Sequence, residues 1–300
     1  MKQGNTKLGK SIWQWSLIAG LETICIGATS ACLKVCYAMR NHYRYEPVQD
    51  SLYKNYELSL TDFFVGFILG CLFLFKIRTV RIHASGDFYS PEYVRKWTEI
   101  AQCRPDVTFY AYTRSWRNRD GSLNDPMLQA FTTLAALPNV RLWYSCDKDT
   151  GEPPLTSHVM RCYLQGNDED TPSYDVDLFF RNLRKSIVKR IKGKIVCPVE
   201  NGATSTTCSA CKLCYTPVLL HRINAKVVKS NSDIGSSGLI DSVFSNDRKC
   251  KQEFKQEEIE NENCISDKQQ ARKSPKPKSR RQHGKPKSAK SRCPRLFAGR

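Results

Sequence analysis

Three cysteines near the amino end of the chain could hold a metal centre. Cys25, Cys32 and Cys36 lie in the segment CIGATSACLKVCY. Thiolates are soft ligands that suit iron–sulfur clusters and zinc. A cubane held by three protein thiolates keeps one iron open for a substrate or cofactor, whereas closed clusters and structural zinc usually take four. The count therefore favours an open [4Fe–4S] cluster. The alternatives are a zinc site that takes a ligand from elsewhere and the packing of small buried side chains.

A second and denser group of cysteines lies farther along the chain. Cys197 precedes a proline, and Cys208, Cys211 and Cys214 follow in a C-x-x-C-x-x-C run. A tight loop with this spacing can wrap three corners of an iron–sulfur cubane, and a distant Cys-Pro can supply the fourth ligand. Zinc more often takes two separated C-x-x-C pairs. The pattern favours a second, closed cluster with a structural or electron-relay role, and zinc is the alternative.

Polar residues follow several runs of apolar and aromatic residues that we expect to be strands. A glycine at a strand end lets backbone approach a ligand, and a neighbouring carboxylate can bind an ammonium group. Hydroxyls and a guanidinium at adjacent strand ends can bind a carboxylate or a phosphate. Ordinary turns, solvated loops and helix caps are the alternative explanations. The candidate cofactor-binding residues are Ser85, Gly86, Asp87, Thr113, Arg114, Ser145 and Asp147.

These residues need a scaffold in which strands and helices alternate. A proline at a first-turn position opens the helical pattern of residues 91–102, and Asn124 is placed to cap a second helix over 125–137. Strands that alternate with single helices predict a mostly parallel α/β sheet, open or barrel-like. Ligands of such sheets bind beyond the carboxyl ends of the strands. The expected strands cover residues 12–19, 79–84, 107–113, 140–145 and 176–180.

Composition divides the chain into a folded part and a basic tail. The 300 residues are 40% hydrophobic, so disorder throughout is excluded, and the formal net charge is +18. Residues 271–300 hold 12 basic residues and no acid, which leaves +6 of that +18 for residues 1–270. We therefore expect an iron–sulfur domain over 1–222 and a disordered basic tail over 223–300. The tail cysteines Cys250, Cys264 and Cys293 lack ligand spacing and are interpreted as incidental.

The tail also suggests a rival function. Its charges could bind nucleic acid nonspecifically through residues 271–300, which would suit a non-catalytic nucleic-acid-binding protein whose cysteines hold structural metals. The modest charge of the rest of the chain argues against that reading.

No membrane segment is expected. The longest apolar run, Phe63–Phe75, has 13 residues, short of the ~18 that a spanning helix needs. It has no polar face, which predicts a buried helix or a partner surface. Gln14, Ser16 and Glu22 interrupt the signal-like amino end. The expected location is therefore the cytoplasm, where thiols stay reduced.

Longer motifs carry a family resemblance. The segments KLGKSIWQWSL, CIGATSACLKVCYA, VRIHASGDFYSPEYVRKW, FYAYTRSW and CPVENGATSTTCSACKLC span roughly residues 5–218. They resemble the phage gene-product-88 family, which is similar to radical S-adenosylmethionine (SAM) enzymes. The cysteine spacing C-x6-C-x3-C differs from the usual C-x3-C-x2-C, and Val35 stands where an aromatic residue is common.

The resemblance implies a fold, a cofactor and a reaction. The fold is a partial (β/α) barrel of the radical-SAM type. A [4Fe–4S] cluster on Cys25, Cys32 and Cys36 binds SAM at its open iron, and Ser85-Gly86-Asp87 takes the place of the motif that holds the SAM amino group. The implied reaction reduces SAM to a 5′-deoxyadenosyl radical that abstracts hydrogen from an unknown substrate, with an electron donor as partner.

Overall fold

The computed structural model describes residues 1–166, 170–181, 195–199 and 206–216, all within one compact unit, Met1–Asp247. The expected domain boundary near residue 222 lies outside the described residues. So do the basic tail 223–300 and its three cysteines.

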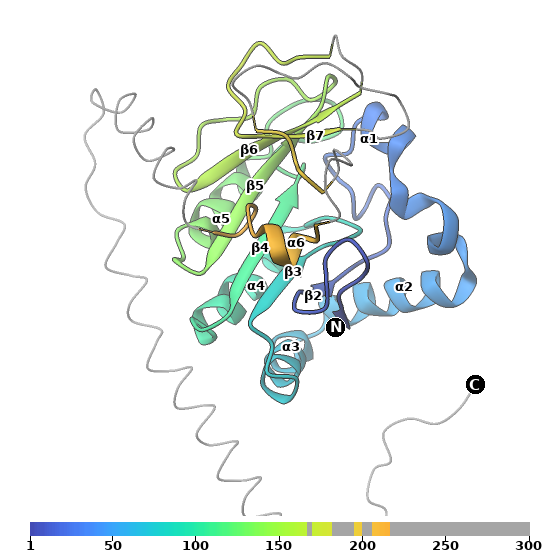
Figure 1. Cartoon of the computed structure of the whole chain (residues 1–300), viewed down its shortest axis with the longest axis vertical. Helices are drawn as coiled ribbons and strands as arrows, with labels where there is room; N and C mark the ends of the chain where they lie inside the picture. Colours follow the sequence, from blue (N-terminus) through green and yellow to red (C-terminus); the bar gives the residue numbers. More distant parts are fainter. Residues whose placement is uncertain (167–169, 182–194, 200–205, 217–300) are drawn as a thin grey trace, which may run out of the picture. The chain divides into compact units, whose positions relative to one another are not determined.

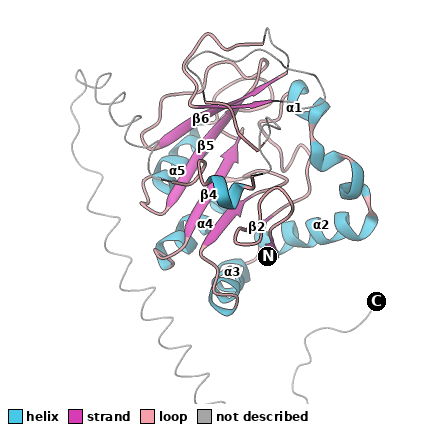
Figure 2. Ribbon diagram, viewed as in Figure 1, coloured by secondary structure: helices cyan, strands magenta, loops and turns pink. Residues whose placement is uncertain are grey.

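A seven-stranded sheet forms the centre of this unit (Figure 2). Its strands lie in chain order from β1 to β7, so each strand pairs with the one before it. β1 is antiparallel to β2, and every later pair is parallel. The predicted α/β class is therefore confirmed. The strands are β1 (Lys2–Gln3), β2 (Trp13–Trp15), β3 (Thr79–Ile82), β4 (Thr108–Thr113), β5 (Val140–Cys146), β6 (Val159–Gln165) and β7 (Leu178–Arg181).

Helices make the crossovers between the first parallel strands. α2 (Glu46–Leu60) and α3 (Phe63–Leu74) join β2 to β3, α4 (Pro91–Cys103) joins β3 to β4, and α5 (Asp125–Ala135) joins β4 to β5. Both predicted helix starts are confirmed. The Ser90 hydroxyl accepts a hydrogen bond from the amide of Tyr93, and the Asn124 side chain accepts one from the amide of Met127. The short helices are α1 (Ser30–Val35), η1 (Tyr37–Met39), η2 (Asn41–Arg44) and α6 (Cys208–Cys211).

One face of the sheet packs against α4 and α5, which lie behind the strands in Figure 1. Aromatic rings form this part of the core, because alternate strand residues point to the same face. Trp97 of α4 contacts Phe109 of β4, and Phe131 of α5 contacts Tyr144 of β5, with ring centroids 6.3 and 6.1 Å apart. All four side chains are fully buried. Each such burial contributes roughly 1.5–3 kcal/mol, which holds the sheet rigid behind the site.

The opposite face of the sheet, which we call the cysteine face, carries Arg81, Tyr110, Tyr112 and Trp143. The segment that contains α6 crosses it, in front of β3 and β4 in Figure 1. The Trp143 indole donates a hydrogen bond of 2.9 Å to the carbonyl of Cys214, and Tyr110 stacks on Tyr215 with ring centroids 5.2 Å apart. The second cysteine group is thereby fixed over the sheet.

The strands differ from prediction at both sides of the sheet. The run predicted over 12–19 is regular only at Trp13–Trp15, because the chain then turns to form the loop that carries the first cysteines. β1 and β6 were not predicted. β6 follows a loop of twelve residues rather than a helix, so it lacks the alternating pattern that identified its neighbours.

α3 is buried on only one side. Phe64, Ile68 and Leu72 face the core, whereas Phe63 is 81% and Leu74 72% exposed. Within the described residues no single helix is long and apolar enough to cross a membrane. α2 and α3 together reach that length and composition, but they are bent by 116°.

Candidate functional site

The loop with the first three cysteines lies against the carboxyl ends of the parallel strands. Its anchor is Thr29, whose side chain accepts a hydrogen bond from the amide of Cys32 at the start of α1. The same hydroxyl donates 2.6 Å to a carboxylate oxygen of Asp147, just after β5. The amide of Ala31 donates 3.0 Å to Asp149. These bonds join the cysteine loop to residues 118 positions away in the chain.

A glycine brings the same loop close to the end of β4. A Cβ atom at Gly27 would lie 2.0 Å from the carbonyl oxygen of Arg114 and 2.8 Å from that of Arg117. Real Cβ atoms do not approach backbone that closely, so only glycine fits without a shift of the chain. The position of the loop over β4 therefore depends on Gly27.

Arg114 connects the first cysteine group to the polar strand ends. One of its guanidinium nitrogens donates to the Cys32 sulfur at 3.3 Å, and another lies 3.1 Å from a carboxylate oxygen of Asp147. The Arg114 side chain is only 12% exposed and that of Asp147 1%. A buried cation that donates to sulfur favours the thiolate form, as a metal ligand requires.

The predicted Ser85-Gly86-Asp87 turn lies beside these groups at the end of β3. Asp87 accepts hydrogen bonds from the amides of Phe88, at 2.7 Å, and Arg114, at 2.9 Å. Burial raises the pKa of Asp87 to about 6, against the lowering effect of these bonds. The Ser85 hydroxyl donates 2.8 Å to the carbonyl of Leu17. Gly86 has φ +76°, the left-handed region that glycine favours. The turn therefore ties the end of β3 to β2 and β4.

The three thiols of the first group influence one another. Burial, with smaller contributions from the nearby Asp87, Cys32 and Cys36, raises the pKa of Cys25 to about 12, and a hydrogen bond from the Gly20 amide opposes this rise. Burial also raises the pKa of Cys32, and Arg114 counteracts that rise. Without a metal the Cys25 and Cys32 thiols are therefore protonated at neutral pH. A metal would have to displace these protons on binding.

The second group also gathers thiols, from residues 197–214. Cys197 is buried with Trp143, and Cys214 packs against the same cluster. Burial, with smaller contributions from Cys197 and Cys208, raises the pKa of Cys214 to about 12. The amide of Cys208 donates 2.9 Å to the carbonyl of Lys7, which links the group to the amino end of the chain.

Both cysteine groups open on one cavity of about 750 Å³ on the cysteine face. Five of the seven candidate cysteines line it, and Cys25 and Cys211 do not. Arg114 and Ser145 line it as well. The lining cysteines are Cys32, Cys36, Cys197, Cys208 and Cys214.

The donor chemistry of this cavity suits an iron–sulfur cluster or zinc. All seven candidate cysteines are free thiols, and soft sulfur is the ligand that these centres take. Among the described residues, however, no three His, Cys, Asp or Glu side chains come close enough together to hold a metal ion. Ligation would therefore require the thiols to turn toward a common centre.

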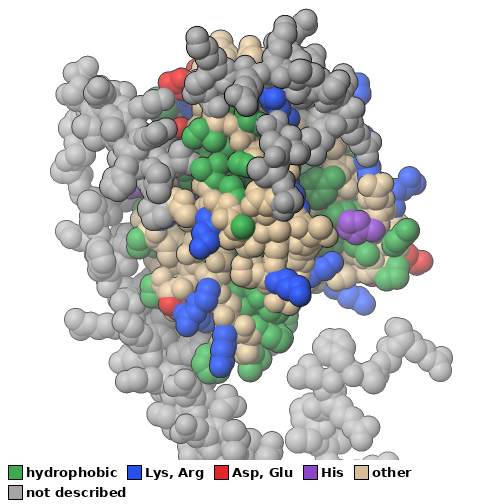
Figure 3. Space-filling model, in the orientation of Figure 1, with side chains coloured by type: hydrophobic (Ala, Val, Ile, Leu, Met, Phe, Trp, Pro, Cys, Tyr) green, Lys and Arg blue, Asp and Glu red, His purple; other side chains and the backbone are tan. Residues whose placement is uncertain are grey.

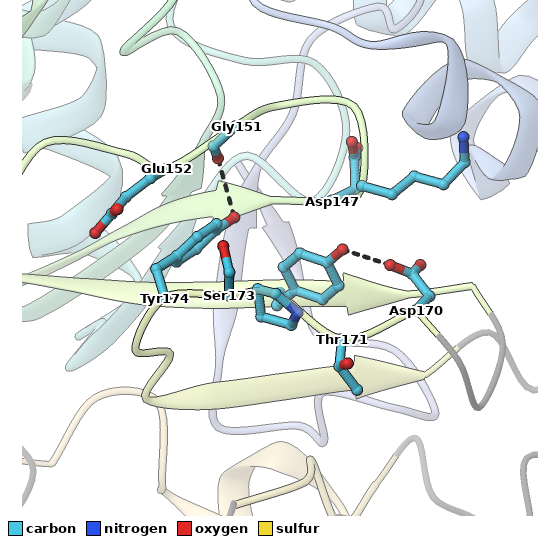
Figure 4. A pocket seen from close by; sticks show the side chains of 10 residues that line it. Asp147, Gly151, Glu152, Asp170, Thr171, Ser173 and Tyr174 are labelled. Carbon is cyan, nitrogen blue, oxygen red and sulfur yellow. Dashed lines mark hydrogen bonds between the residues drawn. The ribbon is translucent and has the colours of Figure 1, made fainter.

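A second hollow, of about 590 Å³, lies on the other side of Asp147 (Figure 4). It has an acidic lining that includes Glu152 and Asp170. Polar groups of this lining already form hydrogen bonds or ion pairs with neighbouring residues. Tyr163 donates a hydrogen bond to Asp170, Tyr174 donates 3.0 Å to the carbonyl of Gly151, and Glu152 pairs with Arg161 at 3.0 Å.

Several residues of the cysteine cavity were not predicted. Arg81, Tyr110 and Tyr112 lie within strands, and their alternation in the sequence gives no sign of which face would line a cavity. Cys162 of β6 is buried in the same cluster as Cys197. A single cysteine within a strand has no ligand spacing, so no sequence signal marked it.

Comparison with known proteins identifies relatives of the chain. The family model described as Gene product 88 matches residues 1–217. The Gene 88 protein of Mycobacterium phage L5 is 31% identical over 161 residues, which cover 49% of this chain and 62% of that protein. The Gene 88 protein of Mycobacterium phage D29 is 30% identical with the same coverage. The match thus spans less than two thirds of these relatives. No solved structure matches the chain.

Proposed function

The chain belongs to the gene product 88 family, and we propose that it is an iron–sulfur protein of the radical SAM type. The observation that carries the proposal is the cavity shared by the two cysteine groups on the cysteine face, which reaches the carboxyl ends of β4 and β5 at Arg114 and Ser145. Ligand and cofactor sites of parallel α/β sheets occur at that end.

The topology of the sheet supports the fold part of the proposal. From β2 to β7 each parallel strand is added beside the previous one, without the reversal of order that marks a doubly wound sheet. α4 and α5 cover one face and leave the cysteine face for a ligand. This arrangement suits a partial (β/α) barrel, the fold that the family resemblance implies.

In this proposal the first cysteine group holds the open cluster. Cys25, Cys32 and Cys36 would be its ligands, and when bound the cluster supplies the electron that cleaves SAM. Arg114 holds the Cys32 sulfur through its hydrogen bond of 3.3 Å. Gly27 and Thr29 keep the loop over the strand ends.

The strand-end residues would bind SAM itself. The Asp87 carboxylate has acceptor positions beyond those used by the Phe88 and Arg114 amides, so it can also receive an ammonium group. Ser85 and Gly86 belong to the same turn. Thr113, Arg114, Ser145 and Asp147 are assigned to the remaining polar groups of SAM.

The second cysteine group would hold a closed centre with a structural or electron-relay role. Its ligands would be Cys197, Cys208, Cys211 and Cys214, in a [4Fe–4S] cluster or, alternatively, with zinc. The contacts of this segment with Trp143 and Tyr110 support a position over the middle of the sheet for such a centre.

Metal analysis of anaerobically purified full-length protein tests the proposal. We expect about eight irons and eight acid-labile sulfides per chain, with absorbance near 400 nm that dithionite bleaches. Stoichiometric zinc without sulfide after anaerobic reconstitution would refute it.

A matched pair of cysteine variants tests the role of the first group. Cys36→Ala should lose about half of the iron and all SAM cleavage. Cys71→Ala changes a free thiol of α3 that does not line the cavity, and it should retain both. SAM cleavage by Cys36→Ala at the rate of the unmodified protein would contradict the assignment.

A further inference from the structure

The cysteine cavity is strongly cationic. Among the residues that the structure describes, five basic side chains line it and no aspartate or glutamate does. The second hollow, on the other side of Asp147, has three carboxylates and one lysine in its lining. Charge is thus segregated between the two hollows, and the cysteine cavity is the one suited to an anion. Its basic residues are Lys7, Arg40, Arg81, Arg114 and Arg181.

Arg81 is the basic residue with the least internal compensation. It lies in the middle of β3, and its guanidinium is 5.4 Å from the centre of the Tyr112 ring. Its Nε is buried without a hydrogen-bond partner, and among the described residues the Arg81 guanidinium forms no hydrogen bond or ion pair. A buried guanidinium left without an acceptor is costly, so this position favours a ligand that supplies one.

Arg114 differs from Arg81 because it already has an anionic partner. Asp147 lies 3.1 Å from its guanidinium, and the Cys32 sulfur accepts another of its hydrogens. Its Nε nonetheless has no partner. Arg114 is therefore part of the cysteine site, while the charge of Arg81 is free for a ligand deeper in the cavity.

Aromatic side chains form much of the remaining wall. Tyr110 and Tyr112 of β4 and Phe180 of β7 line the cavity, and the rings of Tyr112 and Phe180 are 5.4 Å apart. Guanidinium groups bind phosphate oxygens in fixed geometry, and aromatic faces accept planar rings. The combination fits a phosphorylated small molecule with a planar group, as in a nucleotide.

We propose that the cysteine cavity binds the phosphate group of a phosphorylated small molecule and that Arg81 is the main contact. The proposal names the substrate class for the cavity and rests on the proposed function in assigning the substrate site there. Binding of the phosphate itself requires no metal centre, so the two proposals can fail separately.

Isothermal titration of the full-length protein with pyrophosphate, adenosine monophosphate and adenosine tests the proposal. Both metal-free and reconstituted protein are used. We expect pyrophosphate and adenosine monophosphate to bind, uncharged adenosine to bind at least about tenfold more weakly, and the affinity for pyrophosphate to fall as salt is raised.

Two arginines near each other on the chain provide a matched control. Arg81→Gln should weaken pyrophosphate binding about tenfold or more, and Arg81→Lys should restore part of it. Arg78→Gln removes the same charge from an exposed side chain that pairs with Asp106 outside the cavity, and it should bind like the unmodified protein. The basic tail is present in every variant, so its contribution cancels.

The outcomes separate the possibilities. Equal pyrophosphate binding by Arg81→Gln and the unmodified protein, or an equal loss in Arg78→Gln, would overturn the proposal. If Arg81→Gln does not fold, Lys7→Gln at the same cavity should weaken binding instead, and unchanged affinity there would also overturn it. Pyrophosphate binding that depends on Arg81, in a protein that takes up no iron on anaerobic reconstitution, would refute the proposed function and support this inference.

Discussion

At the scale of single residues, the site depends on groups that hold strand ends together. Asp87, Arg114 and Asp147 follow three successive parallel strands, and each is buried or nearly so. Arg114 donates its amide to Asp87 and lies with its guanidinium against Asp147. These buried polar bonds lock the strand ends in register, because breaking one would leave a desolvated group without a partner.

The raised pKa of Asp87 predicts a pH dependence of stability. Its folded value of about 6 exceeds its ordinary value of 3.8, so the folded state binds the proton more tightly than the unfolded state. This contribution is fully present below pH 3.8 and is lost as pH rises through about 6. Relative to Asp87→Asn, the free energy of unfolding of the unmodified protein should fall by up to about 3 kcal/mol over that window in urea titrations.

Asp106→Asn provides the control for this pH effect. Arg104 lowers the pKa of Asp106, so the stabilisation by its charge is present above pH 3.8 and is lost as pH falls further. Relative to Asp106→Asn, the free energy of unfolding of the unmodified protein should therefore change with pH in the opposite direction. A constant difference between Asp87→Asn and the unmodified protein from pH 4 to 7 would show that Asp87 does not carry the effect.

The surroundings of Gly27 and Gly66 predict opposite effects of a substitution by alanine on the free energy of unfolding. Gly27→Ala would place a methyl group 2.0 Å from the Arg114 carbonyl, so it should destabilise the fold by about 1–3 kcal/mol and shift the cysteine loop. Gly66 lies in α3 with nothing within 4 Å of its Cβ position, so Gly66→Ala should stabilise by about 0.5–1 kcal/mol. Urea unfolding measures both. Equal effects of the two would mean that the loop does not pack against β4 as described.

At the scale of elements, α3 shows that composition and burial can differ along one helix. All twelve of its residues are apolar or small, yet only part of its surface meets the core. In Figure 3 hydrophobic side chains gather near the lower edge of the molecule, where Figure 1 places α3. The expectation of a buried helix is therefore partly right, since the helix has a buried side and an exposed apolar side, and the expectation of a partner surface stays a prediction.

Adjacent phenylalanines of α3 test this assignment of its two sides. Phe64 is fully buried against Trp15, Tyr93 and Trp97, so Phe64→Ala should cost about 3–5 kcal/mol of unfolding free energy. Phe63 is 81% exposed, and Phe63→Ala should change it by less than about 0.5 kcal/mol. A reversed order of these two values in chemical denaturation would show that the helix presents its other side to the core.

At the scale of the whole molecule, the family match and the charge distribution concern different parts of the chain. The match ends at residue 217, whereas the basic run begins at Ala271. The candidate site lies wholly within the matched part. The basic run lies outside the matched part, and the role expected for it rests on its charge alone.

Deletion of residues 226–300 tests that division. The truncated protein should keep its metal content and its thermal unfolding temperature, because the contacts of the candidate site among the described residues all lie before residue 217. It should lose most of its nonspecific affinity for DNA or RNA, which in the full-length protein should fall linearly with the logarithm of salt concentration. Loss of metal on truncation would show that the predicted domain boundary is wrong. If the truncated protein still bound DNA with the same dependence of affinity on salt concentration, the result would favour the nucleic-acid-binding function instead.

Local signals in the sequence were sufficient for the framework of the protein. The helix starts at Pro91 and Asn124, the alternation in β4 and β5, and the spacing of the cysteines all act over a few residues. Such signals predicted a parallel α/β sheet, with candidate residues at its carboxyl ends and two separate thiol groups. They missed β6, because no helix lies between β5 and β6 to mark the start of a further strand.

Only the tertiary structure decided how these parts meet. The contact of Arg114 with Cys32 spans 82 positions of sequence, and that of Thr29 with Asp147 spans 118. The placement of both cysteine groups on one cavity with Arg81 follows from which face each strand residue takes. The spacing of residues along the chain does not predict which face of the sheet lines the cavity. That face is determined when the crossover helices bury one face and leave the other open.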